Sequence, residues 1–327
     1  MKLHKSLRPH VRKHTSVRHM MIDIIVSLLL LMIVPIVQNG FRVVSLALLT
    51  ALTCILCEVV FSLLCRTPIA ITECSPVVTG FLIAMLMPVN VPVWVPIIAG
   101  AFAILVAKAP FGGTGRAPFN PAAAGVAFVT VCWPNLVFSY IDKAEAFALP
   151  FLRDCDVQAA ASPAAILKEG LRPEITGPNL LLGMFPGPVG TTSVLVIVAC
   201  ALYIFIKKTA NFDTSLCFAA SAMLFAFLFP RIVGTRLDSV LFEMLSGSLV
   251  FCAVFMASEP STSPRTSLGR CIYGALGGII TMLFRYFGAF EQGAVFAILL
   301  INTLSPALDR FCWRVTELGG GKAHGAE

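Results

Sequence analysis

The chain has 327 residues, of which 57% are hydrophobic and 13% are charged, and its net charge is +7. Soluble domains carry roughly a quarter of charged residues, so a soluble fold could not remove this much apolar surface from water. Apolar runs close to the ~20 residues that cross a bilayer recur along the chain, which predicts one integral membrane domain. The positive charge does not indicate nucleic-acid binding, because the basic residues lie mainly in short connections between these runs.

Ten apolar runs are predicted to form the transmembrane helices of an all-α membrane protein. They cover residues 20–38, 43–65, 75–91, 92–107, 121–136, 191–206, 214–229, 239–258, 270–287 and 292–308. The third, fourth and fifth runs are short and are broken by prolines, namely Pro76, Pro88, Pro92, Pro96 and Pro121. Broken helices are tolerated in a membrane where protein or a cavity covers the freed backbone, so these three are expected to face the interior.

The distribution of basic residues predicts the orientation. If the N-terminus is cytoplasmic and the chain crosses ten times, sixteen of the 24 basic residues fall on the inside: Lys2, Lys5, Arg8, Arg12, Lys13, Arg18, Arg66, Lys108, Arg116, Lys207, Lys208, Arg265, Arg270, Arg310, Arg314 and Lys322. Short outside connections receive four, namely Arg42, Arg231, Arg236 and Arg285, and the long outside loop receives the remainder. The positive-inside rule therefore predicts that both termini are cytoplasmic.

One long connection divides the runs into two groups of five. The predicted parts are a cytoplasmic arm over 1–19, a first half over 20–136, an extracytoplasmic loop over 137–190, a second half over 191–309 and a cytoplasmic tail over 310–327. An odd number of helices per half inverts the second half relative to the first. Two inverted five-helix repeats are therefore expected.

The eleven cysteines form no ligand cluster in the sequence. Most lie in or beside apolar runs, where cysteine behaves as a small hydrophobe. Cys54 and Cys57 have the spacing of a zinc knuckle but no second pair nearby. No metal site is predicted.

Two polar blocks are predicted on the cytoplasmic side. In the first, Phe111 to Arg116 is rich in glycine and is followed by Asn120-Pro121, which can open a helix with a side-chain cap. The second, Glu259 to Thr266, is polar and breaks helices. Each block is suited either to binding a ligand or to making a tight turn, and spacing alone does not separate these alternatives.

A third block, Gly187 to Ser193, precedes the sixth run on the outside and places three hydroxyls, those of Thr191, Thr192 and Ser193, at a helix start. The free amides and the positive dipole end of a helix start can seat a phosphate. An ordinary N-cap is the alternative.

Three carboxylates fall inside apolar runs, Asp23, Glu58 and Glu243, and Glu58 alone is expected to lie deep in the membrane. A carboxylate in lipid is costly and is by default a functional candidate. Glu58 is therefore predicted to be part of an ion pathway, for a cation or a proton. Pairing with a nearby basic group or with an interior water is the alternative.

Four segments carry a resemblance to a known family: Ser6 to Arg12, Val77 to Pro88, Phe111 to Ala123, and Glu259 to Pro264 continuing to Gly269-Arg270. With them the sequence resembles the family formed by the D subunit of the Rnf complex, the ion-translocating ferredoxin:NAD oxidoreductase, and the B subunit of the sodium-pumping NADH:quinone reductase. The short N-terminal arm resembles that of the Rnf subunit more than that of the quinone-reductase subunit, which is usually longer.

The resemblance implies a covalent cofactor. In this family FMN is joined by a phosphodiester to a threonine that ends a small-Gly-x-Thr motif, and Gly190-Thr191-Thr192 resembles that ending, which places FMN on Thr192. Val189, Thr191 and Pro186 depart from the family pattern and leave Thr191 as a possible acceptor. A second, noncovalent riboflavin is also implied, without residues to assign to it.

The resemblance further implies a subunit of the bacterial inner membrane that relays electrons while the assembled complex moves Na⁺ or H⁺. Ferredoxin and NAD are then expected on partner subunits, because the sequence has neither a cysteine cluster for iron–sulfur nor a nucleotide fingerprint. A flavin transferase is expected for maturation. The alternatives are a secondary transporter with a midplane substrate site at the broken helices, and a structural scaffold.

Overall fold

The computed structural model describes residues 17–66, 73–141, 160–232 and 234–320. Within these ranges the chain is helical and has no strand, apart from one isolated antiparallel bridge between Tyr140 and Ala160. The prediction of an all-α fold is confirmed. Most of the predicted N-terminal arm, Cys155 of the long loop and the end of the tail lie outside the described residues.

The first half consists of two long helices followed by shorter, interrupted ones. Their bounds are α1 Val17–Asn39, α2 Arg42–Cys65, α3 Ser75–Met85, α4 Trp94–Phe102, the π-helix η2 Ala103–Lys108, the 3-10 turn η3 Ala109–Phe111, α5 Pro121–Cys132 and α6 Pro134–Val137. Pro76 and Pro121 lie in the first turns of α3 and α5, where a missing N–H has no cost. Pro88 and Pro92 keep the chain non-helical between α3 and α4.

The second half begins after two short helices in the predicted outer loop. The bounds are α8 Pro163–Lys168, α9 Gly177–Leu182, α10 Val194–Ile206, α11 Phe212–Leu228, α12 Arg236–Leu245, α13 Leu249–Phe251, the π-helix η4 Cys252–Met256, α14 Ser267–Phe287 and α15 Ala294–Gly320. The segment Leu249–Met256 is bent by 64° relative to α12.

The helix lengths fit a multi-pass membrane protein. Among the described residues, five single helices are long and apolar enough to cross a membrane, and the bent pair at α12 adds a sixth candidate. Four shorter apolar helices, α3, α5, α10 and α11, accompany them. Each of the ten predicted runs therefore contains one of these segments.

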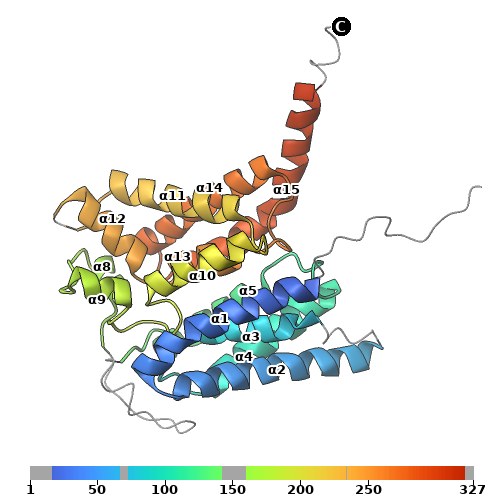
Figure 1. The fold of residues 1–327 in the computed structure, drawn as a ribbon, viewed down its shortest axis with the longest axis horizontal. Coiled ribbons are helices and arrows are strands. Elements are labelled where there is room, and N and C mark those ends of the chain that lie inside the picture. Colours follow the sequence, from blue (N-terminus) through green and yellow to red (C-terminus); the bar gives the residue numbers. More distant parts are fainter. Residues whose placement is uncertain (1–16, 67–72, 142–159, 233, 321–327) are drawn as a thin grey trace, which may run out of the picture.

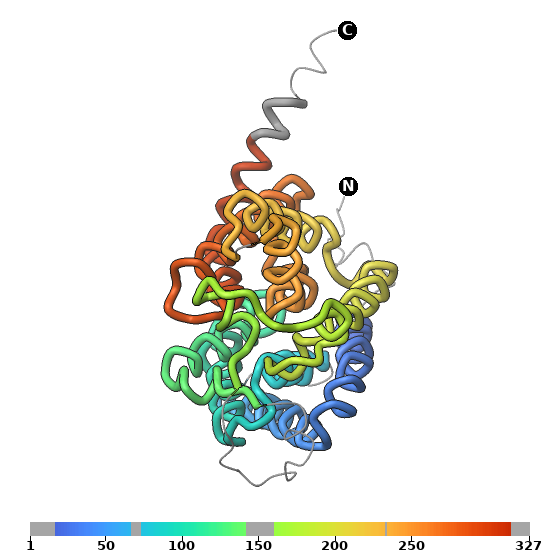
Figure 2. The backbone as a smooth tube through the Cα atoms, turned by 90° about the vertical axis from the view of Figure 1, so that its left-hand side faces the viewer, coloured from blue at the N-terminus to red at the C-terminus, as the bar shows by residue number. Residues whose placement is uncertain are grey.

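The two halves contact each other through helices at matching positions. α1 packs against α10 and α5 packs against α15, so the first helices meet and the fifth helices meet. Within the halves, α2 packs against α3 and α4, and α11 packs against α12 and α14. In Figure 1 the start of α1 and the end of α15 lie on the right, and α8 and α9 lie on the left. Following the predicted orientation, we call these the inner and the outer end; Figure 2 shows the bundle from the outer end.

Small residues allow the helices to approach closely. A Cβ on Gly80 would lie 2.4 Å from the Cα of Ala51, and one on Gly125 would lie 2.4 Å from the carbonyl oxygen of Ala99. These contacts join α3 to α2 and α5 to α4. Close backbone packing of this kind holds helices together where lipid removes the hydrophobic driving force.

The expectation that the third, fourth and fifth segments face the interior is correct for α3, where residues 78–85 are buried. Most residues of η2 and α5 are buried as well, but Val106 and Val131 are 50% and 61% exposed, so these two helices are covered on one side only. These helices pack against α2, α3 and α15 on one side, and their other side is left for lipid or a partner.

Candidate functional site

The block before α10 lies at the outer end of the bundle, and its hydroxyl residues are buried. Thr191 and Thr192 are each 1% exposed, and Ser193 is 3% exposed. Ser193 immediately precedes α10 but makes no side-chain capping bond. The alternative of an ordinary side-chain N-cap is therefore wrong.

The backbone that follows α3 holds this block in place. The Val189 N–H donates to the Met87 carbonyl at 2.9 Å, and the Gly190 N–H donates to the Met85 carbonyl at 2.8 Å. A Cβ on Gly190 would lie 2.5 Å from the Met85 Cβ. Gly190 is therefore required for close packing, whatever its role in a motif.

Two further glycines cover Thr192. Gly183 has φ +77°, and a Cβ on it would lie 2.5 Å from the carbonyl carbon of Thr192. A Cβ on Gly187 would lie 3.0 Å from the Thr192 Cγ2. Thr192 is thus enclosed by backbone on two sides.

The hydroxyls of the two threonines differ in their hydrogen bonds. Thr191 Oγ1 donates to the Pro188 carbonyl at 3.5 Å, whereas Thr192 Oγ1 is buried without a partner among the described residues. A buried hydroxyl without a partner costs about 1–3 kcal/mol. An ester at this oxygen removes the unsatisfied donor, so the residues fit a covalent phosphate at Thr192 better than at Thr191.

At the inner end, the two polar blocks meet across the interface of the halves. Asn120 caps α5 through its Oδ1, which accepts from the Ala123 N–H at 3.1 Å, and its Nδ2 donates to Glu259 Oε2 at 2.8 Å. The predicted cap at Asn120 is confirmed. Burial raises the pKa of the Glu259 carboxyl, although the Ser261 hydroxyl and Lys108 act to lower it.

The same two blocks line a cavity of ≈630 Å³, which we call the inner cavity. Its polar and charged lining residues are Glu73, Thr114, Arg116, Thr209, Glu259, Ser261, Thr262, Ser263, Arg265, Asn302, Ser305 and Asp309. Thr114 Oγ1, Thr262 Oγ1 and Asn302 Nδ2 have no hydrogen-bond partner among the described residues. A concave site of this size with converging polar groups is typical of small-molecule binding, which favours a ligand over a simple turn at both blocks.

Glu58 has a basic partner. Lys108, the last residue of η2, places its Nζ 2.7 Å from Glu58 Oε2, and the two side chains are 2% and 10% exposed. The structure thus shows the alternative in which Glu58 pairs with a nearby basic group, and Lys108 is not a charge of an exposed connection. Both residues line a second cavity of ≈430 Å³ that also contacts Glu73 and Arg116 of the inner cavity.

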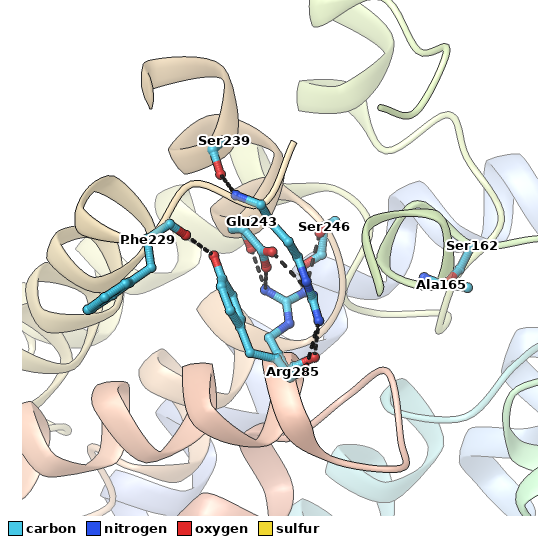
Figure 3. Close-up of polar contacts among 9 residues, drawn as sticks. Ser162, Ala165, Phe229, Ser239, Glu243, Ser246 and Arg285 are labelled. Atoms are coloured by element: carbon cyan, nitrogen blue, oxygen red, sulfur yellow. Dashed lines mark hydrogen bonds and ion pairs between the residues drawn. The ribbon is translucent and has the colours of Figure 1, made fainter. Parts of the chain in front are cut away.

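A buried polar cluster at the bend after α12 has little signal in the sequence. Glu243 is 1% exposed, so it is buried in the bundle as Glu58 is. Arg285 Nη1 lies 3.0 Å from Glu243 Oε2, and Arg231 Nη1 lies 3.5 Å from Glu243 Oε1. Arg285 also donates to the carbonyls of Glu243 and Ser246, at 2.5 and 2.7 Å (Figure 3). These bonds satisfy the carbonyls that the bend releases.

The helix α3 links the outer block to the inner cavity. Ser75, Thr79 and Leu82 of α3 line a recess. The same recess is lined by Thr114, Asn120 and Glu259 of the two polar blocks. Leu82 lies one turn before Met85, a rise of about 5 Å, and Met85 holds Gly190. The two regions therefore lie close to opposite ends of one short helix.

Broken apolar helices, buried ion pairs and a cavity lined by both groups of helices define the chain as a multi-pass all-α membrane protein. The model of the family described as NQR2, RnfD, RnfE matches residues 4–316 of the chain. The chain belongs to this family.

Curated relatives agree with the family over nearly the whole chain. The D subunit of the Na⁺-translocating ferredoxin:NAD⁺ oxidoreductase complex of Acetobacterium woodii is 30% identical over 94% of the chain and 92% of the relative. The D subunit of the proton-translocating ferredoxin:NAD⁺ oxidoreductase complex of Clostridium ljungdahlii is 29% identical over 94% and 93%. The D subunit of the ion-translocating oxidoreductase complex of Halorhodospira halophila is 25% identical over 93% and 92%.

Proposed function

We propose that this chain is the flavin-carrying membrane subunit of an Rnf-type complex, which couples electron transfer between ferredoxin and NAD to the movement of Na⁺ or H⁺. Support comes from the family and from relatives that are named as subunits of such complexes. Ferredoxin and NAD bind partner subunits. Because one similar relative is named for sodium and another for protons, similarity does not select the ion.

The observation that carries the proposal is the hydroxyl of Thr192 just before α10, which has no hydrogen-bond partner in the described part of the chain. FMN joined to this oxygen by a phosphodiester supplies one- and two-electron chemistry. Gly190 sets the backbone beside Met85, and Thr191 and Ser193 flank the ester. Since Thr192 is 1% exposed, the segment from Gly183 to Val189 has to move when the flavin transferase acts.

A second, noncovalent flavin, riboflavin, fits the inner cavity. The unpartnered atoms of Thr114, Thr262 and Asn302 would supply hydrogen bonds to a ring with donors and acceptors. The helix α3 joins the two regions, since its Leu82 lines the recess beside this cavity and its Met85 accepts the Gly190 N–H of the Thr192 block. This arrangement supports electron transfer between an outer and an inner flavin.

Glu58 is the proposed ion-pathway residue. It faces the second cavity together with Lys108, so a cation that enters from the inner end meets a carboxylate that is already paired. In the proposed orientation, the chain lies in the bacterial inner membrane with both termini cytoplasmic and Thr192 on the extracytoplasmic side.

Peptide mass spectrometry tests the flavin assignment. The chain made together with its flavin transferase should carry an FMN-sized adduct on the peptide spanning residues 173–207, and the denatured band should fluoresce under ultraviolet light. Thr192→Val removes the ester oxygen and should abolish the adduct, whereas Thr191→Val should keep it. An adduct that persists in Thr192→Val would move the site to Thr191 or Ser193, and an unmodified wild-type peptide would remove the flavin proposal.

The competing function is a secondary transporter with a midplane site, which the breaks at α3 and α12 support. A transporter purified after maturation would be colourless, while the proposed flavin carrier absorbs visible light. A scaffold would tolerate loss of both threonine hydroxyls without loss of electron transfer by the complex.

A further inference from the structure

The first residue of α2, Arg42, is buried in the folded chain. Its exposure is 1%, and an arginine in such a place is costly unless its donors are used. Arg42 Nε donates to the Val89 carbonyl at 2.8 Å, and Nη2 donates to the Val91 carbonyl at 3.0 Å. Two donors of one guanidinium therefore hold two alternate carbonyls of the non-helical segment 86–93.

This segment needs such donors. α3 ends at Met85, and Pro88 and Pro92 prevent the following residues from continuing the helix. Carbonyls that a helix no longer satisfies are costly inside a membrane protein. The planar fork of arginine can satisfy two carbonyls at once, which a lysine cannot do in the same geometry.

The segment that Arg42 fixes also positions the Thr192 block. Met85 and Met87 accept the N–H groups of Gly190 and Val189, and Val89, two residues further on, accepts from Arg42. A Cβ on Gly190 would lie 2.5 Å from the Met85 Cβ, so the two backbones are in close contact and cannot move independently. A shift of residues 85–91 is therefore passed on to the block that contains Thr192.

We infer that Arg42 is a positioning residue for flavin attachment at Thr192, acting through the backbone of residues 85–91. The inference rests on the proposed function. In the attachment step the Thr192 Oγ1–P bond forms and the phosphoanhydride of a flavin dinucleotide breaks, with AMP as the leaving group and the hydroxyl proton released. Arg42 contacts none of these atoms. Through the backbone of residues 85–91 it fixes the position of Thr192 Oγ1 when the transferase acts.

The test measures the rate of FMN attachment to detergent-purified, unmodified full-length chain by added flavin transferase and FAD, normalised to folded protein in the monodisperse size-exclusion peak. Arg42→Lys should slow attachment by about tenfold or more, since it loses at least one charge-assisted hydrogen bond. Arg285→Lys is the control for the loss of a buried arginine fork: Arg285 is 3% exposed and donates to carbonyls at the break after α12, on helices other than α2 and α3. Attachment in this control should stay within about twofold of wild type.

The outcomes separate the two proposals. Wild-type chain that takes no flavin on Thr192 would defeat the proposed function itself. If the wild-type chain is modified, a normal rate in folded Arg42→Lys would overturn the inference, as would an equal loss in Arg285→Lys. Should Arg42→Lys fail to fold, Arg42→Gln takes its place, because the amide keeps two N–H donors without the charge; slowed attachment in the folded variant supports the inference, and a wild-type rate overturns it.

Discussion

Glu58 and Lys108 lie on different helices and meet at 2.7 Å inside the bundle. Removing one partner of a buried pair leaves an uncompensated charge, with a cost of about 3–5 kcal/mol, whereas replacing both by neutral groups is often close to neutral. The structural and functional roles of Glu58 can therefore be separated by comparing single and double variants.

We expect Glu58→Gln to keep the flavin and the assembly of the complex but to weaken coupled ion transport. The double variant Glu58→Gln/Lys108→Met also removes the Lys108 ammonium, which Glu58→Gln leaves buried without its carboxylate. It should restore thermal stability while transport stays low. Sodium or proton uptake by vesicles that contain the complex measures this. Transport at the wild-type level in the double variant would show that the pair is structural.

Glu259 gives a second prediction at the residue scale. Burial raises the pKa of its carboxyl above the ordinary value of 4.5. Below that value the group is protonated in both the folded and the unfolded chain, and the stability it contributes is lost as the pH rises through the folded-state pKa. Glu259→Gln does not titrate, so its Tm relative to wild type should increase from pH 4.5 upward.

Differential scanning fluorimetry in detergent across this pH range provides the measurement. Glu169→Gln removes an exposed carboxylate and reports the effect of net charge alone. A difference in Tm between Glu259→Gln and wild type that falls with pH would contradict the assigned direction.

At the scale of elements, broken helices depend on neighbours that supply donors and close contacts. Arg42 satisfies carbonyls after α3, and Arg285 satisfies carbonyls after α12. α3 itself lies against α2 through Gly80. These contacts allow helices too short to span the bilayer alone to remain ordered inside the bundle.

Gly80→Ala should destabilise the bundle, because its Cβ would lie 2.4 Å from the backbone of Ala51. Overpacking of this kind costs about 1–3 kcal/mol, which should appear as a lower Tm in detergent. Gly177→Ala is the control, since a Cβ at Gly177 meets nothing within 4 Å. Equal Tm values for the two variants would argue that α2 and α3 can separate without cost.

At the scale of the whole molecule, the start of α1 and the end of α15 lie at one end, opposite α8 and α9 (Figure 1). The pairing of α1 with α10 and of α5 with α15 matches helices of the same rank in the two halves. The two inverted five-helix repeats stay a prediction of the sequence.

The orientation in the cell can be tested with cysteine reagents that do not cross membranes. In spheroplasts these reagents should label Cys155 and an introduced Asn179→Cys in α9, but not Ser267→Cys at the start of α14, until the membrane is permeabilised. Asn179 and Ser267 are both exposed, so the side of the membrane on which each residue lies, and not its burial, decides whether the reagent labels it. Labelling of Ser267→Cys alone would reverse the topology.

The sequence by itself determined the helical segments, the Asn120 cap and the all-α membrane class, because these depend on local composition and on proline chemistry. Hydrophobicity sufficed to find all ten segments. Hydrophobicity did not show that η2 and α5 each have one exposed side that faces away from the bundle, since exposure depends on which neighbours cover a helix.

Tertiary structure decided which charged and polar groups meet. Lys108 reads as a loop charge in the sequence, yet it neutralises Glu58 from a π-helix. Arg42 reads as a topology marker, yet it binds carbonyls 47 and 49 residues away. Likewise, the sequence favours Thr192 over Thr191 only through a motif resemblance, whereas the folded chain satisfies the Thr191 hydroxyl and leaves that of Thr192 without a partner among the described residues. The physical reason is that hydrogen bonds and ion pairs between distant segments depend on packing, which sequence spacing does not encode.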